Sequence, residues 1–236
     1  MLGSINLINL SIKHKIKCFV FTSSIAVYGK NQLPMTEETN PKPEDPYGIA
    51  KLAVEYDLAS AYNLFGLNYI IFRPHNVYGE RQNLSDKYRN VIGIFINKII
   101  KNEPLIIFGD GEQTRAFSYI GDVAPVIAKS ILEKKAYNEV FNIGADEVYS
   151  VNQLAQEVIK AMGQEKHQII YEPSRNEVVH AYSSHEKIKR ILGYKASTKL
   201  QEGIKKMAQW AKNTGIKESE KFNNIEIEEN LPPSWK

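Results

Sequence analysis

Hydrophobic and polar positions along the chain follow two different periods in alternating segments. Apolar residues recur at helical spacing in seven segments, and short apolar runs separate most of them. The helices are predicted at 2–12, 46–65, 91–100, 121–134, 151–162, 184–192 and 200–212, and the strands at 18–21, 67–72, 105–108, 115–120, 140–143 and 167–171. Strands that alternate with helices in this way predict an α/β protein with a parallel sheet.

Polar residues at the predicted helix starts support several of these boundaries. Asp45 followed by Pro46 is typical of a helix start, because aspartate accepts hydrogen bonds from the free amides of the first turn and proline fits the first helical position. Ser150 with Gln153 forms a capping-box pattern. Asp122 is expected to cap the helix that it opens.

Composition and charge argue against several classes of function. The 236 residues are 43% hydrophobic, which is ample for a buried core, and the net charge is only +3, so nucleic-acid binding is not expected. No apolar run approaches the length of a transmembrane helix, so membrane contact is not expected either. The single cysteine, Cys18, cannot form an internal disulfide, which fits a cytoplasmic protein. No metal site is expected, because the lone His75 has no second ligand at metal-binding spacing.

One pair of side chains offers acid–base chemistry. Tyr47 and Lys51 lie one turn apart on the same face of a predicted helix. An ammonium ion beside a phenol stabilises the phenolate, which makes the phenol a usable base near neutral pH. The buried strand at 18–21 delivers Ser24 at its carboxyl end, where open α/β sheets bind their ligands. The sequence therefore predicts a site that contains these three residues.

The order of the motifs along the chain resembles one family. Segment 21–29 is followed by Tyr47-x-x-x-Lys51, by Arg73-Pro74-x-Asn76-x-Tyr78-Gly79 and by the long segment 109–124. Together they resemble the extended short-chain dehydrogenase/reductases, and within them the NAD-dependent epimerase/dehydratase family of the UDP-glucose 4-epimerase type. The resemblance implies NAD as the cofactor and a nucleotide sugar as the substrate, either a UDP-hexose or a UDP-N-acetylhexosamine.

The resemblance also implies a fold and a division into domains. The expected fold is a partial Rossmann-like, doubly wound parallel sheet with a smaller, interleaved substrate-binding α/β domain. Residues 1–80, with 121–145 returning to them, would form the C-terminal part of the NAD-binding domain, and 81–120 with 146–236 the substrate-binding domain. The family's Gly-x-x-Gly-x-x-Gly turn does not occur in the sequence. We therefore expect a truncated chain that lacks roughly 90 to 100 residues, or three βα units of about 30 residues each, and that binds NAD weakly.

The resemblance assigns catalytic and cofactor roles to five residues. Tyr47 would take the proton from a sugar hydroxyl, and Ser24 would hydrogen-bond that hydroxyl. Lys51 would bind the nicotinamide ribose and support the tyrosine. Ser23 and Pro74 would lie beside the cofactor.

Further residues would bind the substrate. Asn76 and Arg115 are the expected ligands of its diphosphate, a task that for Arg115 suits the planar, permanently charged guanidinium group. Arg175 is the expected second substrate arginine. Ala181 falls at the position that admits or excludes an N-acetylated sugar, and its small side chain favours a roomier pocket.

The sequence thus predicts NAD-dependent epimerisation of a nucleotide sugar, at C4 of a UDP-hexose. Family members that dehydrate or decarboxylate the sugar use an extra carboxylate in the segment of Ile25 and Ala26, and both of these residues are apolar. Two alternatives remain open, a non-catalytic nucleotide-sugar-binding module and a nucleotide-sugar reductase or dehydrogenase. A homodimer through helices of the Rossmann domain is one possible assembly.

Overall fold

The computed structural model describes residues 1–86, 90–174 and 180–215, which form two compact units. Unit 1 comprises Met1–Val77, Ala116–Val148 and His180–Ser197. Unit 2 comprises the described residues within 78–115, 149–179 and 198–236. The chain therefore passes several times from one unit to the other.

A three-stranded parallel sheet forms the centre of unit 1. Its order is β1 (Cys18–Thr22), β2 (Asn68–Pro74) and β7 (Glu139–Ile143). Phe21 pairs with Ile71 across the first two strands, and Phe72 pairs with Phe141 across the second pair. The prediction of a parallel α/β sheet is confirmed.

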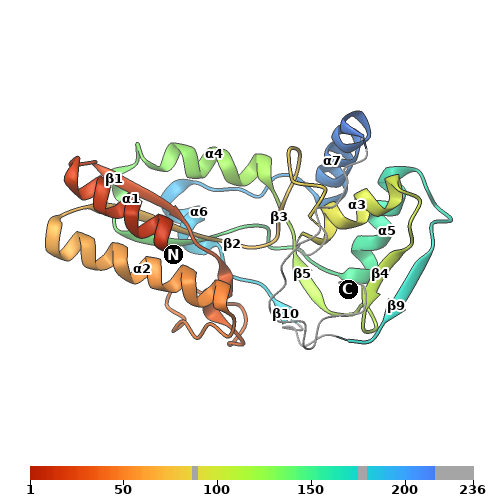
Figure 1. Ribbon diagram of the computed structural model, residues 1–236, viewed down its shortest axis with the longest axis horizontal. Helices are drawn as coiled ribbons and strands as arrows, with labels where there is room; N and C mark the ends of the chain where they lie inside the picture. The colour runs from red at the N-terminus through yellow and green to blue at the C-terminus, as the bar shows by residue number, and fades with distance from the viewer. Residues whose placement is uncertain (87–89, 175–179, 216–236) are drawn as a thin grey trace. The chain divides into compact units, whose positions relative to one another are not determined.

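Helices cover both faces of this sheet (Figure 1). The helices α1 (Leu2–Lys13) and α2 (Pro46–Phe65) pack on one face, where Ile71 lies in the same core cluster as Leu58 of α2. The helices α4 (Ile120–Ser130) and α6 (Glu186–Leu192) pack on the other face, in the cluster that contains Ile70 and Phe72. Successive residues of β2 thus point to opposite cores, which is why this strand reads as a continuous apolar run.

Unit 2 is smaller and is built around two parallel strands, β4 (Leu105–Phe108) and β9 (Ile169–Glu172). Three helices belong to it, α3 (Val91–Ile100), α5 (Val151–Met162) and α7 (Leu200–Thr214). Ser150 and Gln153 form the predicted capping box at the start of α5. Phe95, Leu154 and Met207, one from each helix, are fully buried.

Short elements complete the described chain. They are η1 (Ile25–Tyr28), β3 (Val77–Tyr78), β5 (Thr114–Ala116), β6 (Ser118–Tyr119), η2 (Lys134–Ala136), β8 (Val148–Ser150) and β10 (His180–Ala181). Among the described residues, no helix is both long enough and apolar enough to span a membrane.

Three details differ from the sequence-based predictions. The strand predicted at 115–120 is split into β5 and β6, and α4 ends at Ser130 rather than near residue 134. Asp122 does not cap α4, because the helix begins one turn earlier with Tyr119 as its N-cap. The Asp122 carboxylate instead accepts a hydrogen bond from the Ser197 hydroxyl at 3.0 Å.

Residues 180–197 also lie elsewhere than predicted. The sequence groups them with 146–236, whereas the structure places them in unit 1. The reason is packing, because Ile188 of α6 and the following Tyr194 are buried in one cluster with Phe141 of β7. The assignment of cofactor and substrate to the two units stays a prediction.

Candidate active site

The start of α2 has the predicted geometry. Asp45 is the N-cap, and its Oδ1 accepts a hydrogen bond from the Gly48 amide at 2.7 Å. Pro46 occupies the first helical position. A capped start fixes the register of the helix, so Tyr47 and Lys51 lie in its first two turns.

Lys51 is held at the carboxyl end of β1. Its Nζ donates a hydrogen bond to the Thr22 carbonyl at 2.7 Å and lies 5.0 Å from the centre of the Phe21 ring. The same ammonium group is 5.6 Å from the centre of the Tyr47 ring. Burial lowers the pKa of Lys51, and the negative charge of Glu55 opposes this effect. The structure therefore brings the predicted tyrosine–lysine pair together with the end of the strand.

Ser24 belongs to the segment that packs directly against the first turn of α2. A Cβ atom added at Gly48 would lie 2.6 Å from the Ala26 carbonyl oxygen, so only glycine permits this approach of the two backbones. The Ser24 hydroxyl accepts a hydrogen bond from the Ala26 amide at 3.1 Å and caps η1. Tyr47, the neighbour of Gly48, is 56% exposed and is open to a ligand.

Ser23 is placed differently from Ser24. It is buried, its amide donates to the Phe72 carbonyl, and its hydroxyl donates to the carboxylate of Glu55. Its hydroxyl is thus engaged inside the unit.

A buried polar network supports the site, and the sequence analysis did not foresee it. Glu55 lies one turn beyond Lys51 on α2 and forms a bidentate ion pair with Arg73 at the end of β2. Arg73 also donates to the Tyr28 hydroxyl at 2.8 Å, and that hydroxyl donates to Oδ1 of Asn142 at 2.8 Å. The network therefore joins α2, the segment after β1, β2 and β7. The spacing of Glu55 from Lys51, four residues along one helix face, was the signal available in the sequence.

The segment after β2 presents Asn76 toward solvent. Pro74 ends the strand and is half-buried. Asn76 is exposed and adopts a left-handed backbone with φ of 39°. Its Nδ2 donates to the Ala116 carbonyl at 3.0 Å, which fixes the orientation of the side-chain amide.

The remaining predicted site residues belong to unit 2, to β10 or to the part of the chain outside the described residues. Arg115 belongs to unit 2 and is half-buried, and its Nη1 donates to the Thr114 carbonyl at 2.8 Å. Ala181 is half-buried on β10. Arg175 lies outside the described residues.

The geometry of unit 1 fits the nicotinamide end of a dinucleotide. The fixed ammonium of Lys51 and the exposed phenol of Tyr47 lie at the carboxyl end of a parallel strand, where sheets of this kind bind nucleotides. These residues could hold the ribose and the reacting carbon. Together with the sheet between two helical layers, they define a Rossmann-type nucleotide-binding enzyme.

Comparisons with known proteins agree with this class. The NAD dependent epimerase/dehydratase family matches residues 1–144. The "Putative UDP-glucose 4-epimerase" of Methanocaldococcus jannaschii is 40% identical over 215 residues, which is 90% of this chain and 69% of that protein. The chain therefore belongs to the NAD-dependent epimerase/dehydratase family.

Solved structures show the same fold. The UDP-glucose 4-epimerase of Thermotoga maritima, determined with UDP-glucose, matches with a TM-score of 0.83 and 35% identity over 91% of this chain and 69% of that one. The UDP-N-acetylglucosamine 4-epimerase of Methanobrevibacter ruminantium, in complex with UDP-N-acetylmuramic acid, matches with a TM-score of 0.85 and 28% identity. That alignment covers 91% of this chain and 69% of the other.

Proposed function

We propose that the protein contributes the catalytic residues of an NAD-dependent nucleotide-sugar epimerase acting at C4 of a UDP-hexose. The observation that carries this proposal is the Lys51 ammonium, fixed by the Thr22 carbonyl beside the exposed Tyr47 ring. The proposal is also supported by family membership and by the names of the most similar proteins.

The proton chemistry rests on three side chains. Tyr47 takes the proton from the sugar hydroxyl and later returns it, while Ser24 hydrogen-bonds the same hydroxyl. Lys51 stabilises the negative charge on the phenol oxygen and orients the nicotinamide ribose. Lys51 would hold the nicotinamide ribose of NAD, and the cofactor would supply a hydride acceptor and donor for the carbon that bears this hydroxyl. Neither the sugar nor the cofactor is therefore oxidised overall.

The residues next to Ser24 favour epimerisation over dehydration. A dehydration needs a further acid or base to remove the elements of water from neighbouring carbons. Ile25 and Ala26 are apolar and cannot move a proton. We infer a reaction confined to one carbon.

The substrate diphosphate is assigned to Asn76, Arg115 and Arg175. The amide of Asn76 has a fixed orientation, and guanidinium groups bind phosphate oxygens through paired hydrogen bonds. Ala181 leaves room for an N-acetyl group, so we propose that UDP-N-acetylglucosamine is accepted as well as UDP-glucose. The ratio of the two turnover rates tests this assignment.

The function is tested by following UDP-glucose and UDP-galactose by chromatography in the presence of NAD. Tyr47→Phe is expected to lower turnover by about 100-fold or more, since general acid–base catalysis contributes about 10²- to 10⁴-fold. Tyr171→Phe is the control, because Tyr171 is 55% exposed and lies outside the residues assigned to the site and to the interface. Equal activity of the two variants would overturn the role of Tyr47.

The same assay separates the alternative functions. Net formation of NADH would indicate a dehydrogenase, since an epimerase returns its hydride. Binding of UDP-sugar without any interconversion would indicate a binding module. Either result would replace the proposed reaction.

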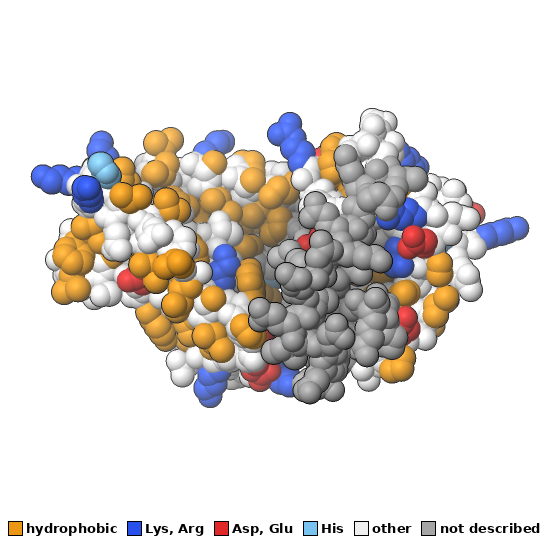
Figure 2. Space-filling view, in the orientation of Figure 1, with side chains coloured by type: hydrophobic (Ala, Val, Ile, Leu, Met, Phe, Trp, Pro, Cys, Tyr) orange, Lys and Arg blue, Asp and Glu red, His pale blue; other side chains and the backbone are white. Residues whose placement is uncertain are grey.

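We further propose a homodimer through α1 and α2. Figure 2 shows hydrophobic side chains gathered over these two helices. Besides the site residue Tyr47, the exposed apolar residues are Leu2, Leu7 and Leu10 of α1 and Ile49, Tyr56, Tyr62, Leu64 and Phe65 of α2. Such a patch on neighbouring helices is typical of a protein interface.

Light scattering after gel filtration tests the dimer. The double variant Leu7→Glu and Leu64→Glu is expected to be monomeric, because it places charges in the apolar patch. Leu132→Glu is the control, since Leu132 follows α4 and is 81% exposed. The dimer would be contradicted if the unmodified protein stayed monomeric over a 100-fold range of protein concentration.

A further inference from the structure

Two histidines from distant parts of the chain meet inside unit 1. Nε2 of His75 lies 3.1 Å from Nε2 of His185, and the rings stack with their centres 5.2 Å apart and an angle of 19°. Both residues are fully buried, at 3% and 1% exposure. Neither ring takes part in the proposed proton chemistry.

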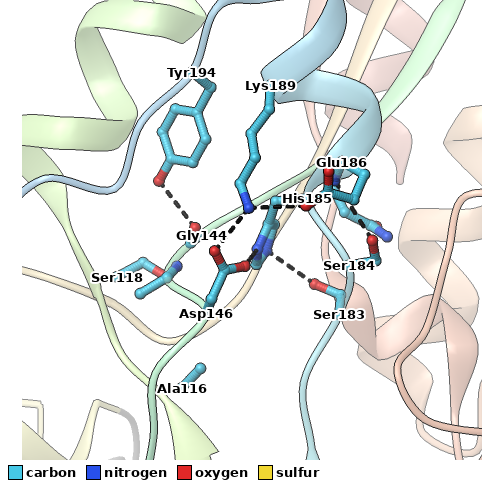
Figure 3. A network of polar contacts seen from close by, with 12 residues as sticks. Ala116, Ser118, Gly144, Asp146, Ser183, Ser184, His185, Glu186, Lys189 and Tyr194 are labelled. Atoms are coloured by element: carbon cyan, nitrogen blue, oxygen red, sulfur yellow. Dashed lines mark hydrogen bonds and ion pairs between the residues drawn. The ribbon is translucent and has the colours of Figure 1, made fainter.

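His185 is connected to charged groups at the surface (Figure 3). Its Nδ1 donates to Oδ1 of Asp146 at 2.7 Å, and Oδ2 of Asp146 accepts from Lys189 at 2.9 Å. Lys189 also donates to Glu186 at 3.0 Å. Asp146 follows β7, whereas Lys189 and Glu186 lie on α6. A line of contacts thus runs from the surface to the buried ring of His75.

The other side of His75 is connected to Asn76. Nδ1 of His75 lies 3.1 Å from the Ala116 carbonyl, and this same oxygen accepts the hydrogen bond from Nδ2 of Asn76. The Ser118 hydroxyl donates to the His75 carbonyl at 2.9 Å, and the Ser118 amide donates to the Asn76 carbonyl at 3.1 Å. A shift of the His75 ring would therefore move the anchor of Asn76.

Polar, aromatic and charged neighbours together fix the orientation of the His185 ring. The Ser183 hydroxyl lies 3.2 Å from Nε2, and Tyr194 packs at its edge with ring centres 6.5 Å apart. Burial raises the pKa of Asp146, but the hydrogen bonds from His185 and Lys189 more than offset this effect and hold the pKa below its usual value. An ionised Asp146 keeps a proton on Nδ1 of His185, so Nε2 of the neutral ring accepts from the Ser183 hydroxyl, and the two histidine rings meet by packing contact.

Gly144 provides the space for this arrangement. A Cβ atom at this position would overlap Nε2 of His75 and would lie 2.6 Å from the Ser118 hydroxyl oxygen. The Gly144 carbonyl in turn accepts a hydrogen bond from Tyr194 at 3.1 Å. The close contact of the two histidines therefore depends on the backbone that follows β7.

We propose that His185 is a positioning residue for Asn76, that it acts through His75, and that Asp146 holds it in the required orientation. The inference rests on the proposed function, in which Asn76 binds the substrate diphosphate. Through Asp146 and Lys189, the cluster connects Asn76 to α6.

Lys189 donates hydrogen bonds to two carboxylates, Asp146 and Glu186, and this allows a matched pair of variants. Asp146→Asn removes the charge that faces His185, whereas Glu186→Gln removes a charge that faces only Lys189 among the contacts shown in Figure 3. Calorimetric titration with UDP is expected to show about 3- to 30-fold weaker binding for Asp146→Asn, the range of coupling through a side-chain network. Glu186→Gln is expected to bind within twofold of the parent protein. Equal affinities for the two variants would overturn the proposal.

A spectroscopic readout separates positioning from a loss of folding. The side-chain amide signal of Asn76 in a ¹⁵N–¹H spectrum is expected to shift in Asp146→Asn and to stay in place in Glu186→Gln. His185→Gln is expected to shift it further, and should this variant fail to fold, the two surface variants still decide the question. An unmoved Asn76 signal in a folded Asp146→Asn protein would contradict the inference.

Asn76→Ala distinguishes the inference from the function on which it rests. If Asn76→Ala weakens UDP binding and Asp146→Asn does not, only the positioning role fails. If Asn76→Ala binds UDP as the parent does, or if the parent does not bind UDP, the proposed role of Asn76 fails. The shift of the Asn76 signal then decides the coupling by itself.

Discussion

Glu55 and Arg73 form a bidentate ion pair in the interior of unit 1. Nε of Arg73 lies 3.0 Å from Oε1 of Glu55, Nη2 lies 2.5 Å from Oε2, and both residues are 5% exposed. Hydrogen bonds extend this pair to Ser23 and Tyr28. The pair and its hydrogen bonds thus connect α2 to the ends of β1 and β2.

Replacement of Glu55 is expected to destabilise the protein severely. Glu55→Gln leaves the guanidinium of Arg73 buried without its counter-charge, and such a loss costs about 3–5 kcal/mol of unfolding free energy. Urea unfolding measures the difference. Glu202→Gln breaks the exposed pair with Lys206 and is expected to cost about 0.3–0.5 kcal/mol. Similar losses of unfolding free energy in the two variants would show that the buried pair stabilises the protein no more than the exposed pair does.

The reactivity of the Lys51 amine is expected to depend on the negative charge of Glu55. Because burial lowers the pKa of Lys51 while Glu55 raises it, Glu55→Gln is expected to lower that pKa further. The pH dependence of acetylation by a small anhydride, followed by mass spectrometry, measures the change. Acetylation of the exposed Lys42 serves as the internal reference. An unchanged profile in a folded Glu55→Gln protein would contradict the electrostatic coupling.

The close backbone contact at Gly48 makes a second prediction about stability. Gly48→Ala places a methyl group against the Ala26 carbonyl, and such overpacking costs about 1–3 kcal/mol. Gly3→Ala is the control, because its Cβ would meet nothing within 4 Å on α1. That substitution is expected to be neutral or to stabilise by about 0.5–1 kcal/mol. Thermal unfolding of the two variants tests the contrast, and equal melting temperatures would argue against the contact.

The buried histidines make stability depend on pH. Burial, followed by the charge of His185, lowers the pKa of His75 from 6.5 to about 3, and burial also lowers the pKa of His185. The unfolded chain therefore binds protons that the folded chain does not bind. For His75, stability is fully present above pH 6.5 and is lost as the pH falls from 6.5 toward 3, by up to about 1.4 kcal/mol per pH unit. His185 adds to this loss in the same direction.

Unfolding experiments between pH 7 and 5 measure this slope. His75→Gln is expected to reduce it, whereas His14→Gln, at an exposed position, is expected to leave it unchanged. A slope that is the same in all three proteins would show that other groups cause the acid sensitivity.

Local sequence patterns predict much of the fold, because the relevant forces act over short distances along the chain. Asp45 and Pro46 set the start of α2 within a few residues, and the apolar run of β2 fixes a buried strand. Asp122 shows the limit of this reasoning. It has the chemistry of an N-cap, but α4 begins before it, and its carboxylate contacts Ser197, which lies 75 positions away.

The polar interior could not be predicted in the same way. The spacing of Glu55 from Lys51 indicates that both lie on one face of α2, but only the fold shows that Arg73 pairs with Glu55. His75 and His185 are 110 positions apart and come together because β7 and α6 pack in unit 1. Such contacts depend on tertiary structure, and neither periodicity nor capping patterns contain this information.

Two requirements limit which residues can replace Asn76: a left-handed backbone and a side-chain amide that donates to the Ala116 carbonyl. Glycine or aspartate could also adopt the turn, but neither carries an amide that donates to the Ala116 carbonyl. Glutamine carries the amide, but its longer side chain gives it no preference for this backbone. Glycine at this position would keep the turn but lose the hydrogen bond to the Ala116 carbonyl. If Asn76 binds the diphosphate as proposed, the residue found here in other members of the family would indicate whether they retain this contact.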